Sequence, residues 1–147
     1  MLTRAWLGIH LPGVKNGACM TMILVVDGDA SHAGRMKALL ESYRCAVLEA
    51  GTALSAMRII NDHTPDLVLV DMALPGIDGI TMVKLLKTNP RTSRVPVIVL
   101  AESPTRQEKE QIAQAGCNHI LNKSCHGPEL VQAMQRYIRN NDQKALL

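Results

Sequence analysis

Short runs of apolar residues alternate along the chain with longer segments in which apolar residues recur every three or four positions. The short runs leave few or no side chains for solvent, which is typical of strands that are buried on both faces of a sheet. The predicted strands span residues 23–26, 46–48, 67–70, 97–100 and 119–121.

Each predicted strand is followed by a segment with the i, i+3, i+4, i+7 spacing of an amphipathic helix. Ser31 and Thr52 are the predicted N-caps of the first two helices. We expect Leu54 in the second helix and Leu85 in the third to point into the core. The segment 105–115 begins with polar residues and becomes apolar only at its end, so we expect this helix to be held weakly.

Five strand–helix units with buried strands predict a doubly wound α/β domain, in which right-handed crossovers place helices on both faces of a parallel sheet. The chain of 147 residues is too short for two ordinary domains. We expect residues 1–21 to form a disordered extension, residues 22–141 to form the domain, and residues 142–147 to be a tail or the end of the last helix.

Composition and charge exclude several classes of function. Aromatic residues make up only 2% of the chain, so single-stranded nucleic acid would find almost no rings on which to stack its bases. The net charge of +3 is mild and gives no electrostatic case for DNA or a membrane surface. No run approaches the ~20 apolar residues of a membrane span. The four cysteines include no CxxC pair, which suits a reducing compartment and predicts a cytoplasmic protein.

Two cysteines and two histidines lie close together near the C-terminal end of the predicted domain. They are Cys117, His119, Cys125 and His126. Structural zinc sites usually have paired short spacings, which this cluster lacks. We interpret these side chains as core or incidental residues and predict no metal site there.

Charged residues follow the ends of several predicted strands. In a doubly wound sheet the ligand crevice lies beyond the carboxyl ends of the strands. Asp27 follows the first strand, Asp71 the third and Lys123 the fifth. Any one of them could be a solvated loop residue, but two carboxylates and an ammonium at one sheet edge suit a hard divalent cation together with a phosphoryl group.

Four segments resemble the receiver domain of two-component response regulators. They are ILVVD at 23–27, DLVLVDMALPGIDG at 66–79, VPVIVLA at 95–101 and AGCNHILNK at 115–123. The resemblance implies a five-stranded sheet with strand order 2-1-3-4-5. It also implies a signalling and interaction module that is not an enzyme and that accepts a phosphoryl group from a histidine kinase or phosphotransfer protein. We see no second domain after the last predicted helix, so we expect the module to have no output domain of its own.

The resemblance also implies a role for individual residues. Asp71 corresponds to the phosphoacceptor, and Lys123 to the cation that contacts the phosphoryl oxygens. Asp27, Asp71 and the backbone carbonyl of Ala73 correspond to ligands of Mg²⁺. Receivers carry a second acid directly after the first, where this chain has Gly28, so we expect weak Mg²⁺ binding, with Asp29 as the candidate for the missing acid.

The parts that transmit the signal in receivers differ in this chain. Ala101 stands where the family has a threonine or serine hydroxyl, Glu102 replaces a small residue, and Ile120 replaces the aromatic residue of the fifth strand. We therefore expect phosphorylation to change the packing of residues 105–121 and 128–139 only slightly. These segments form the face through which receivers dimerise, and we expect a homodimer to use it.

Two other functions stay open at this point. One is a pseudo-receiver, which binds partners without being phosphorylated. The other is a phosphatase of the haloacid-dehalogenase type, because Asp27 and Asp29 fit its nucleophile and acid pair and Lys123 its phosphate-binding lysine. Such enzymes need a serine or threonine at the end of a later strand, where this chain has Ala101.

Overall fold

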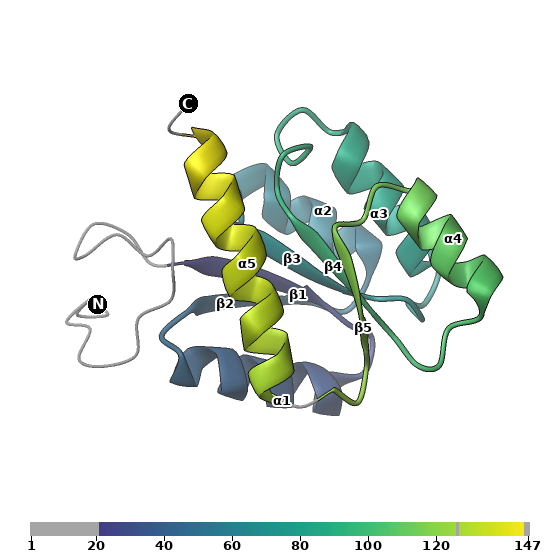
Figure 1. Ribbon diagram of the computed structural model, residues 1–147, viewed down its shortest axis with the longest axis horizontal. Coiled ribbons are helices and arrows are strands. Elements are labelled where there is room, and N and C mark those ends of the chain that lie inside the picture. The colour runs from purple at the N-terminus through teal and green to yellow at the C-terminus, as the bar shows by residue number, and fades with distance from the viewer. Residues whose placement is uncertain (1–20, 126, 146–147) are drawn as a thin grey trace.

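The computed structural model describes residues 21–125 and 127–145, and the side chains of those up to residue 138. Strands and helices alternate in the predicted order (Figure 1). The strands are β1 (Met22–Val26), β2 (Ala46–Ala50), β3 (Leu67–Asp71), β4 (Val97–Ala101) and β5 (His119–Asn122). The helices are α1 (Ala30–Ser42), α2 (Ala53–Asp62), α3 (Gly79–Thr88), α4 (Arg106–Gln114) and α5 (Gly127–Ala145). The expected extension lies outside the described residues except for Thr21.

The strands form one parallel sheet in the order β2-β1-β3-β4-β5, which confirms the expected strand order. Helices α1 and α5 cover one face of this sheet, and α2, α3 and α4 cover the other (Figure 1). The carboxyl ends of β1 and β3, which are neighbours, meet at the same edge. The fold is therefore the doubly wound α/β domain that the alternating pattern predicts.

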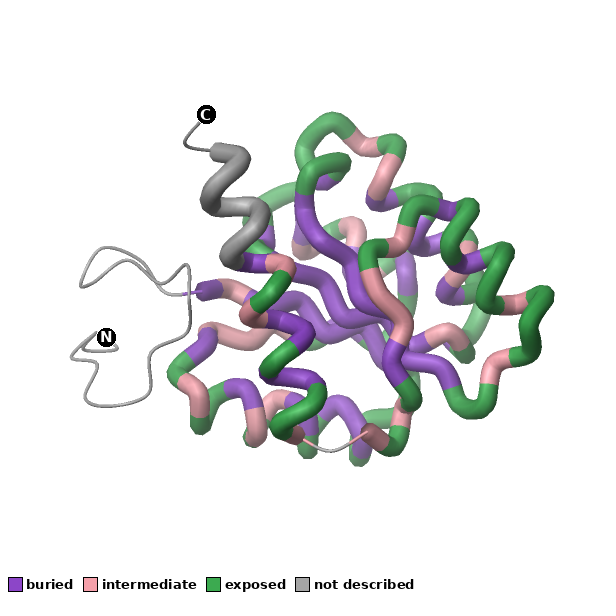
Figure 2. The backbone as a smooth tube through the Cα atoms, in the orientation of Figure 1, coloured by how far each residue is buried: buried purple, intermediate pink, exposed green. Residues whose placement is uncertain are grey.

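Successive residues of the central strands belong to opposite cores, as the period of a strand requires. In β1, Ile23 and Val25 pack beneath α1 and α5, whereas Leu24 and Val26 pack beneath α2 and α3. Figure 2 shows the central strands as largely buried, and β3 and β4 are buried along their whole length. Burial on both faces is the physical reason that their sequences carry no polar alternation.

The N-cap of α1 is Asp29, and the prediction of Ser31 is wrong. Asp29 has extended backbone angles, and its carboxylate accepts hydrogen bonds from the amides of Ser31 and His32. Ser31 already lies within the helix. The predicted cap of α2 is confirmed, because the side chains of Thr52 and Ser55 form a reciprocal capping box.

Two leucines that we expected in the core point outward instead. Leu54 is 62% exposed and Leu85 is 37% exposed. Leu54 directly follows the buried Ala53, and Leu85 directly precedes the buried Leu86. One step along a helix turns a side chain by about 100°, so both leucines lie beside the buried face of their helix. The buried positions of the two helices are Ala53, Ala56, Ile60, Gly79, Met82, Val83 and Leu86.

Helix α4 has the narrow apolar face that its sequence predicts. Ile112 is its buried residue, and Ala115 at its C-cap is buried as well. Its N-terminus is fixed by a capping box between Thr105 and Glu108. Among the helices of the described part of the chain, none is both long and apolar enough to cross a membrane.

Candidate functional site

The three charged side chains predicted from the strand ends converge in the structure. Asp71 ends β3, whereas Asp27 directly follows β1 and Lys123 directly follows β5. The ammonium Nζ of Lys123 lies 2.8 Å from Oδ2 of Asp71 and 4.0 Å from Oδ1 of Asp27. Both aspartates are only 3% exposed. Two buried carboxylates thus share one cation at the edge of the sheet.

The carboxylate of Asp71 is oriented by the loop that follows it. Its Oδ1 accepts a hydrogen bond of 3.0 Å from the amide of Ala73. The loop then returns to the strand, because the amide of Gly79 donates to the carbonyl of Met72 at 3.0 Å. A Cβ atom at position 79 would lie 2.6 Å from the carbonyl oxygen of Asp71, so this close approach requires glycine.

The carboxylate of Asp27 is held by two donors. Its Oδ1 accepts from the amide of Asp29 at 2.8 Å, and its Oδ2 contacts Nδ1 of His32. Burial raises the pKa of Asp27, but the hydrogen bonds from Asp29 and His32 and the charge of Lys123 outweigh it, so the pKa is lowered below its ordinary value of 3.8. Asp27 therefore stays ionised inside the site.

His32 is a member of the site that sequence reasoning missed. It lies in the first turn of α1 and is 9% exposed. While its Nδ1 contacts Asp27, its Nε2 lies 3.3 Å from the backbone carbonyl oxygen of Lys123. The sequence does place a histidine five positions after the strand-end Asp27, which is a weak signal of a site residue. Its contact with Lys123 can be recognised only in the folded structure.

Lys123 is held in its charged form. The hydrogen bond to Asp71 raises its pKa above the ordinary 10.5, against the opposing effect of burial, and the charges of Asp27 and Asp71 act in the same direction. Its backbone amide donates to the carbonyl of Ala101 at 3.0 Å. An ammonium fixed in this way can contact an anionic oxygen that arrives beside Asp71.

The remaining predicted residues contribute less to the site. Ala101 is buried at the end of β4 and presents a methyl group, while Glu102 is exposed. The carboxylate of Asp29 is exposed and engaged as the N-cap of α1, where its Oδ1 accepts from the amide of Ser31 at 3.0 Å. This role directs the Asp29 carboxylate to the helix amides. Among the described residues, no hydrogen bond links Asp29 to Asp71 as a second acid of the site.

The site offers hard oxygen donors of the kind that Mg²⁺ prefers. These donors are the buried carboxylates of Asp27 and Asp71. Every carboxylate oxygen also has a protein donor, and these donors are the amides of Asp29 and Ala73, Nδ1 of His32 and Nζ of Lys123. The donor set fits Mg²⁺. Because position 28 is glycine, the site has one carboxylate fewer than it would have with an acid there.

The cysteine and histidine cluster near β5 can be judged only in part, because His126 lies outside the described residues. Burial raises the pKa of Cys117 and of Cys125, so both thiols are held in the protonated form, which is a poor metal ligand. Within residues 21–125 and 127–138, no three histidine, cysteine or acidic side chains are arranged to hold a metal ion.

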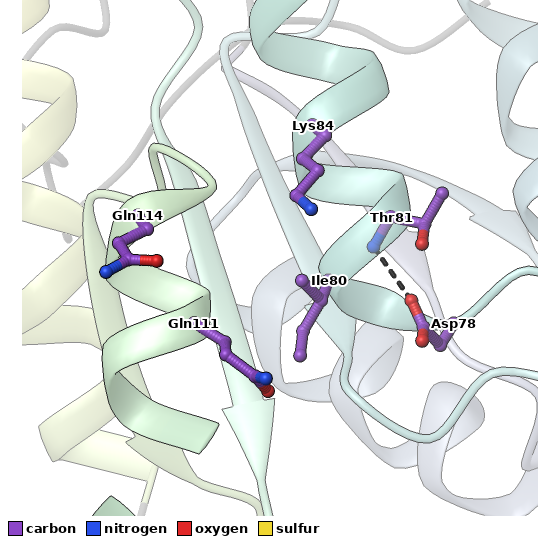
Figure 3. A pocket seen from close by; sticks show the side chains of 6 residues that line it. All are labelled: Asp78, Ile80, Thr81, Lys84, Gln111 and Gln114. Atoms are coloured by element: carbon purple, nitrogen blue, oxygen red, sulfur yellow. Dashed lines mark hydrogen bonds between the residues drawn. The ribbon is translucent and has the colours of Figure 1, made fainter. Parts of the chain in front are cut away.

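A separate polar cavity of about 570 Å³ lies between α3 and α4. Figure 3 shows its walls, with the side chains of Ile80 and Lys84 on α3 opposite Gln111 and Gln114 on α4. Asp78, at its rim, is engaged as the N-cap of α3 through the amide of Thr81. None of the residues that line this cavity is one of the convergent charged residues, so the candidate site lies outside it.

Comparison with known proteins gives the same family at the levels of sequence and structure. The family model for the response regulator receiver domain matches residues 23–135. The polar-differentiation response regulator DivK of Brucella ovis is 24% identical over 116 residues, which cover 79% of this chain and 94% of that protein.

Solved structures agree. A putative response regulator from Chloroflexus aurantiacus superposes with a TM-score of 0.78 and 28% identity, over 82% of this chain and 98% of that one. The receiver domain of a sensor histidine kinase from Pseudomonas aeruginosa, which has a magnesium ion coordinated in its active-site cleft, gives a TM-score of 0.76 and 28% identity over the same shares. Since the family model extends over most of the chain, this protein belongs to the response regulator receiver domains of two-component signalling.

Proposed function

We propose that Asp71 accepts the phosphoryl group. The observation that carries the proposal is the ion pair of 2.8 Å between Asp71 and Lys123 at the carboxyl edge of the sheet. A carboxylate oxygen of Asp71 attacks the phosphorus of a phosphohistidine on a histidine kinase or phosphotransfer protein. The phosphorus–nitrogen bond breaks, and its electron pair leaves with the imidazole. Lys123 then contacts the oxygens of the transferred group.

Asp27, Asp71 and the carbonyl of Ala73 are the proposed ligands of Mg²⁺. A bound Mg²⁺ neutralises the charge that develops on the phosphoryl oxygens. The magnesium ion in the receiver from Pseudomonas aeruginosa supports this assignment. With Gly28 in place of an acid, and with Asp29 engaged as a helix cap, we expect the ion to bind weakly.

The signalling role has several further parts. We place the receiver at residues 22–141, which contains the range 23–135 of the family model. We propose that it acts in the cytoplasm, does not bind nucleic acid, turns over no phosphomonoester, and forms a homodimer through α4, β5 and α5.

The pseudo-receiver alternative is less favoured because the proposed acceptor and lysine are paired. The phosphatase alternative is less favoured because Asp29 caps α1.

The proposal is tested by incubating the full chain with acetyl phosphate and Mg²⁺ and locating the adduct by peptide mapping. We expect a single phosphoryl group on the peptide that contains Asp71, and none on the peptide that contains Asp27. An adduct on Asp27 would support the phosphatase instead. Hydrolysis of p-nitrophenyl phosphate, measured in parallel, is expected to remain at the level of the buffer.

A further inference from the structure

One carboxylate of the candidate cation site is already occupied by a ring from the protein. His32 directs Nδ1 at Oδ2 of Asp27, and the amide of Asp29 donates to the other oxygen at 2.8 Å. Both carboxylate oxygens of Asp27 are thus hydrogen-bonded before any ligand arrives. We propose that His32 competes with Mg²⁺ for Asp27 and so sets the affinity of the site for the ion. This inference rests on the proposed function only in assigning Mg²⁺ to this site.

The competition follows from the geometry of the two contacts. Mg²⁺ takes oxygen ligands at about 2.0–2.1 Å and demands near-octahedral geometry. The N–H group that His32 directs at Oδ2 lowers the negative charge that the Asp27 carboxylate offers to an ion, whichever of its two oxygens binds. The ion must therefore either share this carboxylate with the imidazole, at an electrostatic cost, or displace the ring from Asp27.

Displacement of the ring is opposed by the surroundings of His32. The residue is 9% exposed, and its Nε2 lies 3.3 Å from the carbonyl oxygen of Lys123. A buried N–H that loses its partner costs free energy comparable to a lost hydrogen bond. Because α1 holds the backbone of His32, the ring cannot leave Asp27 without disturbing its second contact as well.

The same ring connects the two halves of the site. It joins the carboxylate of Asp27, after β1, to the backbone of Lys123, after β5. These strands are not neighbours, because β3 and β4 lie between them. His32 is therefore a positioning residue as well as a competitor, and a variant that keeps only its hydrogen bond to Asp27 separates these two roles.

The test is calorimetric titration of the full chain with Mg²⁺ alone, without a phosphodonor. His32→Leu fills the space but donates no hydrogen bond, whereas the amide of His32→Asn can replace Nδ1 as the donor. His63→Leu is the matched control, because His63 is exposed at the far end of α2. The Mg²⁺-dependent rise in Tm is measured on the same four proteins, so that a less stable variant still gives a result.

We expect His32→Leu to lower the Kd for Mg²⁺ roughly tenfold, because a hydrogen bond to a charged group no longer has to be broken. His32→Asn and His63→Leu should stay within about twofold of the parent protein. An unchanged or higher Kd in His32→Leu, or an equal fall in His32→Asn, would overturn the proposal. The outcome is independent of phosphoryl transfer, since failure to phosphorylate Asp71 would overturn the proposed function and leave the change in Kd standing.

Discussion

Lys123 and Asp71, 52 residues apart in the chain, are joined by an ion pair of 2.8 Å between Nζ and Oδ2. Their strands are not neighbours, because β4 lies between β3 and β5. The lysine side chain therefore reaches across the end of β4, where Ala101 is the last residue. The order of the strands in the sheet therefore assembles the site.

The lowered pKa of Asp27 predicts a pH-dependent contribution to stability. A carboxyl group whose pKa in the folded state lies below its unfolded value of about 3.8 stabilises the fold above that pH, and the contribution is lost as the pH falls through the folded pKa. In urea unfolding, the free energy of unfolding of the parent protein should therefore fall relative to that of Asp27→Asn as the pH is lowered from about 5 to about 2.5. A difference that is constant over this range would contradict the lowered pKa.

Restoring the second acid should tighten the cation site at a cost in stability. A Cβ atom at position 28 would lie 2.8 Å from Cδ of Pro75, so Gly28→Asp forces the loop after Asp71 to shift. We expect a loss of about 1–3 kcal/mol in the free energy of unfolding, together with a lower Kd for Mg²⁺ because the ligand charge increases.

Gly28→Ala is the control for that substitution. It introduces the same Cβ contact without a carboxylate, so it should lose similar stability and leave the Kd for Mg²⁺ unchanged. Calorimetry and thermal unfolding on both variants separate the two effects. If Gly28→Asp binds Mg²⁺ no more tightly than Gly28→Ala, the missing acid is not what limits the affinity.

The close approach of Gly79 to the end of β3 predicts a strong effect of one methyl group. Gly79→Ala would place Cβ 2.6 Å from backbone atoms of Asp71 and Met72, and we expect a loss of about 1–3 kcal/mol in unfolding free energy. Gly34→Ala in α1, whose Cβ would meet nothing within 4 Å, should instead gain about 0.5–1 kcal/mol. Equal effects of the two substitutions in urea unfolding would be incompatible with this packing.

The buried methyl group of Ala101 predicts weak transmission of the signal to α4, β5 and α5. Ala101 has no hydroxyl to bond a phosphoryl oxygen, and a ligand shifts an equilibrium only by its differential affinity for the two states. Amide hydrogen exchange over residues 105–121 and 128–139 should change little when a fluoride mimic of the phosphoryl group is added. Strong new protection across 105–121 would show that coupling survives without the hydroxyl.

Much of the fold follows from the sequence because its central strands are buried on both faces. The run 67–70 has no polar residue, and the strand it predicts extends by one residue, to Asp71. The sequence alone does not determine the N-cap of α1, because Asp29 and Ser31 are both favourable cap residues. The backbone angles decide between them. The spacing of apolar residues predicts Leu54 in the core, but it does not determine the rotation of a helix about its own axis relative to the sheet.

The charged part of the site could be predicted for a similar reason. Parallel strands end at one edge, so Asp27, Asp71 and Lys123 had to lie near one another. The sequence does not identify His32 as a site residue, because it lies within a helix and contacts a backbone carbonyl 91 residues away in the chain. Contacts of that kind depend on the packing of α1 against the loop after β5, which no local pattern encodes.

The central claim is that Asp71 accepts a phosphoryl group, and intact-mass measurement after incubation with acetyl phosphate and Mg²⁺ tests it most directly. The parent protein should gain the mass of one phosphoryl group. Asp71→Asn should gain none, and Gly34→Ala, whose change lies on the exposed side of α1, should gain it as the parent does. An adduct that persists in Asp71→Asn, or a parent protein whose mass does not change, would contradict the account.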